Sequence, residues 1–355
     1  MKFLHIADVH LGATPDSNMP WGAQREQEIW SSFQNIVTIC NEEKVDLLLI
    51  AGDLFHRQPL VRELKEVNYL LSKLNTARVI MMAGNHDFIG ARSNYQGFEW
   101  NEKVHMFLND TVDILQFDEL GLEVYGLSYH TRDIMEPLYD AVKPEENERI
   151  HILLAHGGDE RDIPLNRKKL QDSGFDYIAL GHIHKPEIIS ERMAYSGSIE
   201  PIDKNELGEH GYILGEIIQN EKDKATTSIR FVNSTVRQYK RINLTVNQET
   251  TNGSLLDLAK EVIRTNGISH IYSFTILGVR EETLHFNKDA LKCLGNVLEV
   301  DDQSVPDYDF DALYRENADN MIGMFIQNIR ENAKQDEIAR KALYYGIEAL
   351  LGAKN

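Results

Sequence analysis

Five short segments of this chain place side chains that can bind metal ions directly after an apolar run. They are residues 6–10 (Ile-Ala-Asp-Val-His), 51–56 (Ala-Gly-Asp-Leu-Phe-His), 84–87 (Gly-Asn-His-Asp), 155–157 (Ala-His-Gly) and 181–184 (Gly-His-Ile-His). Carboxylate, amide and imidazole ligands without a nearby thiolate suit hard-to-borderline divalent cations, and one aspartate can bridge two such cations with its two oxygens. The residue types therefore indicate a metal site.

One such segment alone is weak evidence, because an Asp-x-His pattern or a lone histidine recurs by chance in core and surface positions. The set is more informative. Six of the chain's thirteen histidines fall in the five segments, and every segment has the same order of an apolar strand, a small residue and a ligand. We therefore interpret the five segments as parts of one site.

The order of the segments resembles that of the calcineurin-like metallophosphoesterases. The resemblance assigns a first ion to Asp8, His10, Asp53 and His184, and a second to Asp53, Asn85, His156 and His182. Paired ions lower the pKa of a bridging water, which attacks as hydroxide, and they stabilise the charge on the phosphoryl oxygens. The resemblance thus implies a phosphoester hydrolase. Manganese is the expected metal, with iron, zinc or magnesium as alternatives.

Three further points concern the same segments. His86, beside Asn85, is placed to protonate the leaving oxygen as a general acid. Asp87 could fix the tautomer of His86 or anchor the loop by capping, and the sequence leaves both roles open. His182 and His184 are two residues apart, so a loop must turn their rings toward neighbouring ions.

His56 extends the resemblance to a narrower group. The string Gly-Asp-Leu-Phe-His at 52–56 resembles the second motif of the SbcD and Mre-eleven type DNA repair exonucleases, in which the histidine lies near the substrate phosphate. Residues 195–200, 298–302 and 306–308 are similar to the bacterial branch of that family. The resemblance implies a DNA exonuclease of repair or recombination, a homodimer and an SbcC-like coiled-coil ATPase partner. A phosphodiesterase or phosphatase for a small nucleotide is the alternative, and an inactive scaffold is a third hypothesis.

The charge balance argues against bulk attraction to nucleic acid, because 37 Lys and Arg face 56 Asp and Glu, a net charge of −19. A local site is still compatible with this balance, since two divalent ions would add positive charge in a cleft. Basic residues near the segments are either solvated charges or phosphate-steering groups: Arg57, Arg62, Lys65, Arg92, Arg161, Arg167, Lys168 and Lys169.

The strands that must position these residues can be recognised in the sequence as apolar runs. Residues 3–7, 45–51, 79–83, 150–155 and 177–180 are predicted strands, and their continuous apolar character indicates sheets covered on both faces. Apolar residues at helical spacing between the first three runs predict crossover helices. Short strands over 122–129 and 187–218 imply a second sheet. We expect an α/β fold, a four-layer sandwich of two mixed β-sheets flanked by helices, with the five segments at the strands' carboxyl ends.

We expect three domains. Residues 1–238 form the metallophosphoesterase (nuclease) domain, 239–308 a small α/β cap domain, and 309–355 C-terminal helices. Apolar residues at helical intervals predict two C-terminal helices, broken near Asn332. These helices either pack on their own domain or bind a partner, and no pair among them is identifiable as a dock for the ATPase.

The start of the chain leaves no room for a signal peptide before the first strand, and no apolar run approaches the ~18 residues that cross a bilayer. Only Cys40 and Cys293 are present, far apart and outside the five segments, so neither disulfides nor a thiolate metal site is indicated. We therefore expect a cytoplasmic protein that does not bind membranes.

Overall fold

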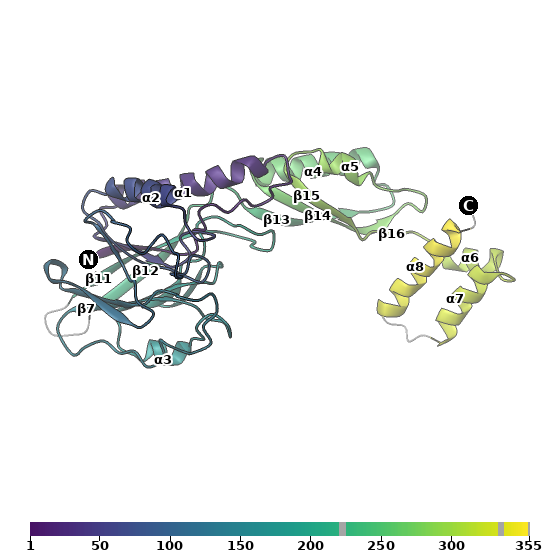
Figure 1. The fold of residues 1–355 in the computed structure, drawn as a ribbon. Helices are drawn as coiled ribbons and strands as arrows, with labels where there is room; N and C mark the ends of the chain where they lie inside the picture. Colours follow the sequence, from purple (N-terminus) through teal and green to yellow (C-terminus); the bar gives the residue numbers. More distant parts are fainter. Residues whose placement is uncertain (220–224, 333–336, 354–355) are drawn as a thin grey trace. The chain divides into compact units, whose positions relative to one another are not determined.

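The computed structural model describes residues 1–219, 225–332 and 337–353, and the chain falls into two units (Figure 1). Unit 1 is Met1–Tyr239 and unit 2 is Lys240–Asn355. The sequence placed the first boundary one residue earlier, at 238. The further division of the second part at 308 stays a prediction.

The first sheet of unit 1 is mixed and has the strand order β12-β11-β1-β2-β3-β4. Strands β1 to β4 are parallel neighbours, and β11 pairs with β1 in the antiparallel sense. The strands are β1 (Lys2–Ile6), β2 (Leu47–Ala51), β3 (Arg78–Met82), β4 (Val104–Met106), β11 (Gly211–Ile218) and β12 (Thr226–Asn233).

The second sheet of unit 1 has the strand order β5-β6-β7-β8-β10-β9. Its inner strands β6, β7, β8 and β10 are parallel, and the edge strands β5 and β9 are antiparallel to their neighbours. The strands are β5 (Asp113–Phe117), β6 (Leu122–Gly126), β7 (Ile150–His156), β8 (Tyr177–Gly181), β9 (Glu187–Ser190) and β10 (Met193–Tyr195). The predicted pair of mixed sheets flanked by helices is confirmed.

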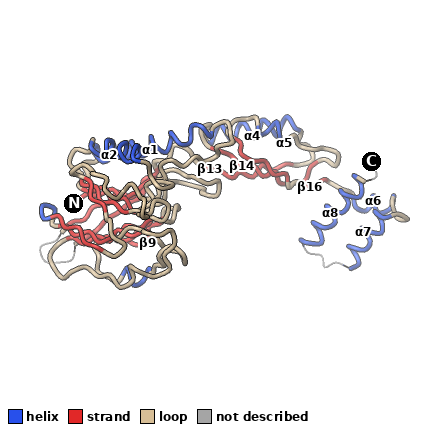
Figure 2. Tube along the Cα trace, viewed as in Figure 1, coloured by secondary structure: helices blue, strands red, loops and turns tan. Residues whose placement is uncertain are grey.

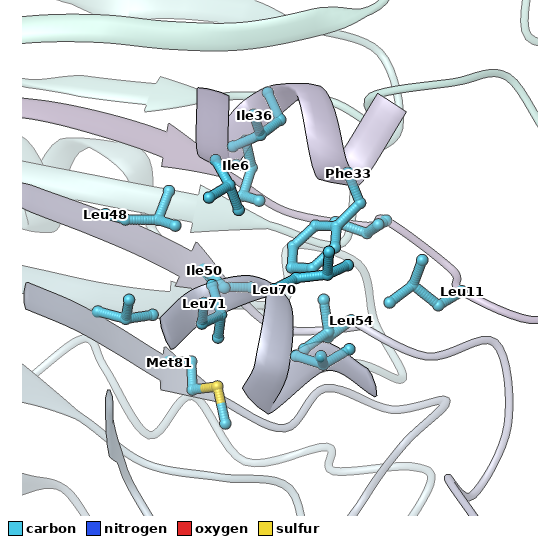
Figure 3. Packing of buried hydrophobic residues seen from close by; sticks show 14 of the residues in the cluster. Ile6, Leu11, Phe33, Ile36, Leu48, Ile50, Leu54, Leu70, Leu71 and Met81 are labelled. Carbon is cyan, nitrogen blue, oxygen red and sulfur yellow. The ribbon is translucent and has the colours of Figure 1, made fainter. Parts of the chain in front are cut away.

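The side chains of β2 alternate between two cores, as the pleat of a strand requires. Leu47 and Leu49 join the core between the sheets, where Phe3 lies 4.4 Å from Tyr177 between ring centroids. Leu48 and Ile50 point into the other core, under the helices (Figure 3). Both faces of the sheet are therefore covered, which explains the continuous apolar run.

Helices α1 (Gly22–Glu42) and α2 (Val61–Ser72) cover the outer face of the first sheet (Figure 2). Their buried stripes, which include Phe33 and Leu71, pack on the strands (Figure 3). The short helix α3 (Arg167–Gln171) lies on the outer face of the second sheet, on the side of unit 1 opposite α1 and α2 (Figure 1). The 3₁₀ turn η1 (Asp118–Leu120) connects β5 to β6.

Unit 2 has its own sheet, in the order β13-β14-β15, with β16 also pairing with β14. Leu255, Ala259 and Ile263 of α4 pack with Tyr272 and Phe274 of β14. The elements are β13 (Tyr239–Val246), α4 (Asn252–Asn266), β14 (Ile271–Arg280), α5 (Lys288–Lys292), β15 (Val297–Asp302) and β16 (Val305–Pro306).

The C-terminal region has three described helices, so the prediction of two was wrong. They are α6 (Phe310–Glu316), α7 (Met321–Asn332) and α8 (Glu337–Gly352). The extra break arises because the Asn320 side chain accepts a hydrogen bond from Ile322 N at 2.9 Å, capping the start of α7. None of the described helices is long and apolar enough to cross a membrane.

Candidate metal centre

All five candidate segments lie at the carboxyl ends of parallel strands. Three follow β1, β2 and β3 of the first sheet, one follows β8 of the second, and β7 ends on His156 itself. The edge where such strands end is the usual ligand site of α/β sheets. Because the strands belong to two sheets, the centre is assembled from both.

The loops after β1 and β2 run side by side and are held by backbone hydrogen bonds. Asp8 N donates to Gly52 O at 3.2 Å, and His10 N donates to Asp53 O at 3.0 Å. Asp8, His10 and Asp53 have φ angles of 50°, 51° and 51°, and His182 has 93°. Non-glycine residues rarely adopt this left-handed region, and clusters of them mark functional sites.

At three positions the residue before the ligand is a glycine, and close packing leaves no room there for a Cβ atom. A Cβ added to Gly52 would lie 2.3 Å from His156 Nδ1, and one added to Gly84 would lie 2.3 Å from Asp53 Oδ1. A Cβ on Gly181 would lie 1.9 Å from Ala51 O. These glycines therefore let the backbone approach the ligands closely.

Asp53 lies at the centre of the arrangement. Its Oδ2 atom is 3.8 Å from His10 Nε2 and 3.6 Å from His156 Nε2. Its Oδ1 atom accepts a hydrogen bond from His86 N at 2.9 Å. The side chain is 2% exposed, so one buried carboxylate oxygen faces two histidines from opposite halves of the centre.

The four residues expected at the first ion converge. His10 Nε2 lies 3.0 Å from His184 Nε2, and His184 Nε2 lies 3.9 Å from Asp8 Oδ1. Asp53 closes the group through its contact with His10. The facing nitrogens and carboxylate oxygens give a donor set that can hold a divalent ion.

Three of the four residues expected at the second ion also meet. Asn85 Oδ1 lies 3.0 Å from His156 Nε2, which faces Asp53, and His156 Nδ1 is 2.8 Å from the acceptor Ala51 O. The His182 ring is 5.3 Å from that of His156 between centroids. Its Nε2 atom, however, faces away from this group and lies 2.9 Å from Asp159 Oδ2.

The candidate catalytic histidines lie beside the first group. His56 Nδ1 is 3.3 Å from His10 Nδ1, and the His56 and His86 rings stack with centroids 5.2 Å apart. His86 Nδ1 lies 3.1 Å from His56 O, its hydrogen-bond acceptor. The structure thus brings both rings to the rim of the site.

Asp87 has the contacts of a loop anchor. Its carboxylate accepts hydrogen bonds from Gly84 N at 2.8 Å, Phe55 N at 3.1 Å and the Tyr95 hydroxyl at 2.7 Å. The Nδ1 atom of His86 is paired with a backbone carbonyl instead. Of the two roles left open by the sequence, these contacts favour anchoring over control of the His86 tautomer.

Burial dominates the electrostatics of the centre. It raises the pKa of Asp8, and burial together with the charges of Asp87 and Asp8 raises the pKa of Asp53 well above its ordinary value. Burial also lowers the pKa of His10 and His156 well below the usual range. The two histidines are therefore neutral, and their ring nitrogens are free to bind cations. A cation bound nearby would favour the ionised form of the two carboxyl groups.

His184 behaves differently from the other histidines. Burial by itself would lower its pKa, but the hydrogen bond and charge of Glu206, with the charge of Asp8, raise it. Burial, and to a lesser extent the charges of His56 and Arg132, lower the pKa of His86.

Sequence reasoning missed four residues at the centre: Asp159, Asp162, Glu206 and Arg132. Asp159 and Glu206 contact the rings of His182 and His184, and Asp162 Oδ2 lies 3.7 Å from His182 Nε2. The charge of the exposed Arg132 contributes to the lowered pKa of His86 and opposes the rise in the pKa of Asp162. None of them sits in a recognisable motif, and only the general need of metal-bound histidines for acceptors could have pointed to such partners.

A pair of divalent ions fits this donor set. Within the described residues the ion pairs of Asp8 and Asp53 are with histidines only, so no lysine or arginine offsets these buried charges. Buried carboxylates without a cation are costly, and bound ions would supply the positive charge. Oxygen and imidazole donors suit hard-to-borderline ions such as Mn²⁺, Fe²⁺ or Zn²⁺.

Comparison with known families agrees with this chemistry. The sequence profile of the family described as calcineurin-like phosphoesterase matches residues 1–186. That match covers the loops that carry all the candidate metal-binding residues.

Individual relatives include bacterial and archaeal proteins. The uncharacterized metallophosphoesterase YhaO of Bacillus subtilis (strain 168) is 29% identical over 242 residues, 62% of this chain and 58% of that protein. The DNA double-strand break repair protein Mre11 of Methanocaldococcus jannaschii is 31% identical over 266 residues, 69% of each chain. Mre11 of Saccharolobus solfataricus is 26% identical over 287 residues, 75% of this chain and 71% of that protein. This chain thus spans less than two thirds of the Bacillus relative.

Proposed function

Because this chain belongs to the calcineurin-like phosphoesterase family, whose members are phosphoester hydrolases that bind two divalent metals, we propose that it is a metal-dependent DNA nuclease. It acts as an exonuclease in DNA repair or recombination. The observation that carries the hydrolase chemistry is the buried Asp53 Oδ2 atom, which faces His10 at 3.8 Å and His156 at 3.6 Å. The similarity to Mre11 proteins over 69% of both chains supports DNA as the substrate.

The proposed ligands divide between the two ions as the family resemblance implies. Asp8, His10, Asp53 and His184 would hold the first ion, and Asp53, Asn85, His156 and His182 the second. Manganese is the proposed metal. When bound, the two ions supply an activated water and stabilise the charge that develops on the phosphoryl oxygens.

The protein's own groups have separate tasks in this proposal. His86 protonates the leaving oxygen, and its backbone carbonyl partner at His56 orients the ring. His56, half-buried beside His10, contacts the substrate phosphate. Arg132 adds positive charge near His86. This positive charge would attract phosphate groups locally, although the chain as a whole has a net charge of −19.

The assembly and location expected from the sequence remain part of the proposal. We propose that the chain forms a homodimer, works with an SbcC-like coiled-coil ATPase and acts in the cytoplasm. Exposed apolar side chains on α7 and α8 support a partner surface there: Met321, Met324, Ile338 and Tyr345. Light scattering of the purified chain, alone and mixed with such an ATPase, tests both associations.

One comparison of substrates tests the proposed function. The manganese-loaded chain is offered labelled single- and double-stranded DNA, cyclic nucleotides and a chromogenic phosphodiester. We expect cleavage of DNA from an end, weakening with salt because backbone phosphates are bound. Preference for a cyclic nucleotide, with no DNA cleavage, would replace the nuclease by a small-nucleotide phosphodiesterase.

Two sets of variants sharpen that comparison. Arg132→Gln should impair DNA cleavage by about 10-fold more than hydrolysis of the small diester, because a polymer needs backbone positioning. The matched control is Arg264→Gln on α4, because this exposed arginine already pairs with Glu261 at 2.6 Å. Equal losses on both substrates for Arg132→Gln would contradict the assignment of Arg132 to DNA.

A further inference from the structure

The two histidines of the 181–184 segment are held by carboxylates from two different loops. Glu206 Oε1 lies 2.6 Å from His184 Nδ1, and Asp159 Oδ2 lies 2.9 Å from His182 Nε2. We propose that Glu206 and Asp159 are positioning residues that fix His184 and His182 as opposite tautomers, so that each ring offers a different nitrogen to a different ion. This proposal rests on the dinuclear centre proposed above.

Glu206 is itself fixed, so it can fix a ring. Its second oxygen accepts a hydrogen bond from Ile202 N at 2.7 Å, and its side chain is 17% exposed. With Nδ1 of His184 donating to Glu206, the Nε2 atom carries the lone pair. That atom is the one 3.0 Å from His10 Nε2 and 3.9 Å from Asp8 Oδ1, inside the first ligand group.

Asp159 holds His182 by the other nitrogen. Its Oδ1 atom accepts from Arg161 N at 2.8 Å and Asp162 N at 3.0 Å, which leaves Oδ2 directed at His182 Nε2. Asp162 adds a second carboxylate, 8% exposed, whose Oδ2 lies 3.7 Å from the same nitrogen. His182 Nε2 therefore donates, and Nδ1 is the nitrogen left to bind an ion.

The backbone of the segment makes room for this divergence. His182 has a φ of 93°, and its N–H is held by the Asp8 carboxylate at 2.9 and 3.1 Å. The His182 ring thus leaves the strand toward His156, while the His184 ring turns toward His10. Two rings that are two residues apart in sequence thereby reach different ligand groups.

Carboxylate partners of metal-bound histidines fix the tautomer, orient the ring and raise its basicity, and losing one costs about 10- to 100-fold in metal affinity. Glu206→Ala and Asp159→Ala should each weaken one of the two ions by about that factor. Glu206→Gln and Asp159→Asn keep an acceptor oxygen, so they should retain most of the affinity. The matched controls are Glu209→Ala and Glu160→Ala, exposed acids on the same loops.

A second readout is the protonation state of each ring nitrogen. In the zinc-loaded full chain with ¹⁵N-labelled histidine, the nitrogen chemical shifts report which ring nitrogen carries the proton. We expect His156 and His184 to be protonated at Nδ1, because these atoms face Ala51 O and Glu206, and only the His184 signal to change in Glu206→Ala. We expect His182 to be protonated at Nε2 and its signal to change in Asp159→Ala. Metal titration by calorimetry then assigns each variant to one binding step.

The outcomes separate the two proposals. If the unmodified chain binds two ions but His182 and His184 share one tautomer, or both alanine variants titrate like the controls, the positioning roles are wrong and the dinuclear centre stands. If the unmodified chain binds fewer than two ions, the dinuclear centre fails, and the positioning roles fail with it. Rescue of affinity by Glu206→Gln and Asp159→Asn would support positioning over a purely structural role of these loops.

Discussion

The Oδ1 atom of Asn85 lies 3.0 Å from the Nε2 atom of His156, and both residues are buried. The other ring nitrogen of His156 is engaged by Ala51 O at 2.8 Å, and burial keeps the ring neutral by lowering its pKa. Two acceptor atoms therefore face each other, which is favourable only with a cation beside them. This relationship leads to the first of five predictions.

Removing the metal should destabilise unit 1. Ions that bind only the folded state stabilise it by about 2.7 kcal/mol each when present at 100 times Kd. We expect chelation to lower the melting temperature by about 10–20 °C, since two ions together contribute about 5 kcal/mol and about 1 kcal/mol corresponds to 2–4 °C at this size. Thermal melts with EDTA and with excess Mn²⁺ measure the difference, and identical melting temperatures would argue against metal binding at this site.

Replacing the central carboxylate should affect both ions. Asp53→Ala removes the oxygen that faces His10 and His156, so we expect loss of most bound metal and a fall in rate of at least about 1000-fold. Elemental analysis and phosphodiester hydrolysis measure both effects. Asp172→Ala, an exposed acid after α3, is the control. Full metal occupancy with normal turnover in Asp53→Ala would exclude the bridging role.

Replacing His86 should reduce catalysis without reducing metal binding. This ring pairs with a backbone carbonyl, so His86→Ala should keep both ions while slowing cleavage by about 100-fold, the usual scale of general acid catalysis. The rate of cleavage should fall least for substrates with a good leaving group, such as a nitrophenyl ester. The control is His130→Ala, a half-buried histidine whose Nε2 atom lies 2.8 Å from Leu108 O. The same loss on good and poor leaving groups would be inconsistent with proton donation.

The anchoring role of Asp87 predicts a stability effect. Tyr95→Phe removes the hydroxyl that donates to Asp87 at 2.7 Å, and hydrogen bonds to charged groups contribute about 1.5–3 kcal/mol. We expect the free energy of unfolding to fall by about that amount, with little change in the pH profile of cleavage. Chemical denaturation measures it, and Tyr69→Phe, 58% exposed, is the control. An altered pH profile with unchanged stability would instead favour the tautomer role.

Acid should destabilise the sheet core through His5. Burial lowers its pKa from 6.5 to about 3, and Nδ1 lies 2.9 Å from the Tyr177 hydroxyl. Because the folded-state pKa is below the unfolded value, stability is fully present above pH 6.5 and is lost as the pH falls toward 3.

A variant isolates this single proton. Relative to His5→Gln, the unmodified chain should lose about 2 kcal/mol of unfolding free energy between pH 6 and pH 4.5, since one proton is worth about 1.4 kcal/mol per pH unit. Denaturant titrations across this range give the difference. Parallel curves for the two proteins would mean that His5 is not the group that titrates.

The metal-binding loops could be predicted from sequence because their signals are local. An apolar run, a glycine and a ligand recur at Gly52, Gly84 and Gly181, and packing demands that order. The carboxylates that contact His182 and His184 could not be predicted. Asp159 and Glu206 lie on loops, and the sequence of a loop has no regular pattern that shows which residue it brings close to a given ring. Nor could the third C-terminal helix be predicted, since the break between α6 and α7 depends on side-chain hydrogen bonds of Asn317 and Asn320, which the spacing of apolar residues does not reveal.

The order of strands in the first sheet bears on synthesis of the chain. β1 is a central strand whose antiparallel partner, β11, lies about 200 residues later, from Gly211 to Ile218. At about 5–20 residues per second, translation leaves one edge of β1 unpaired for about 10–40 s. His184 and Glu206 also emerge late. The nascent chain therefore exposes an aggregation-prone strand edge, and can complete its first ion site only when most of unit 1 has left the ribosome.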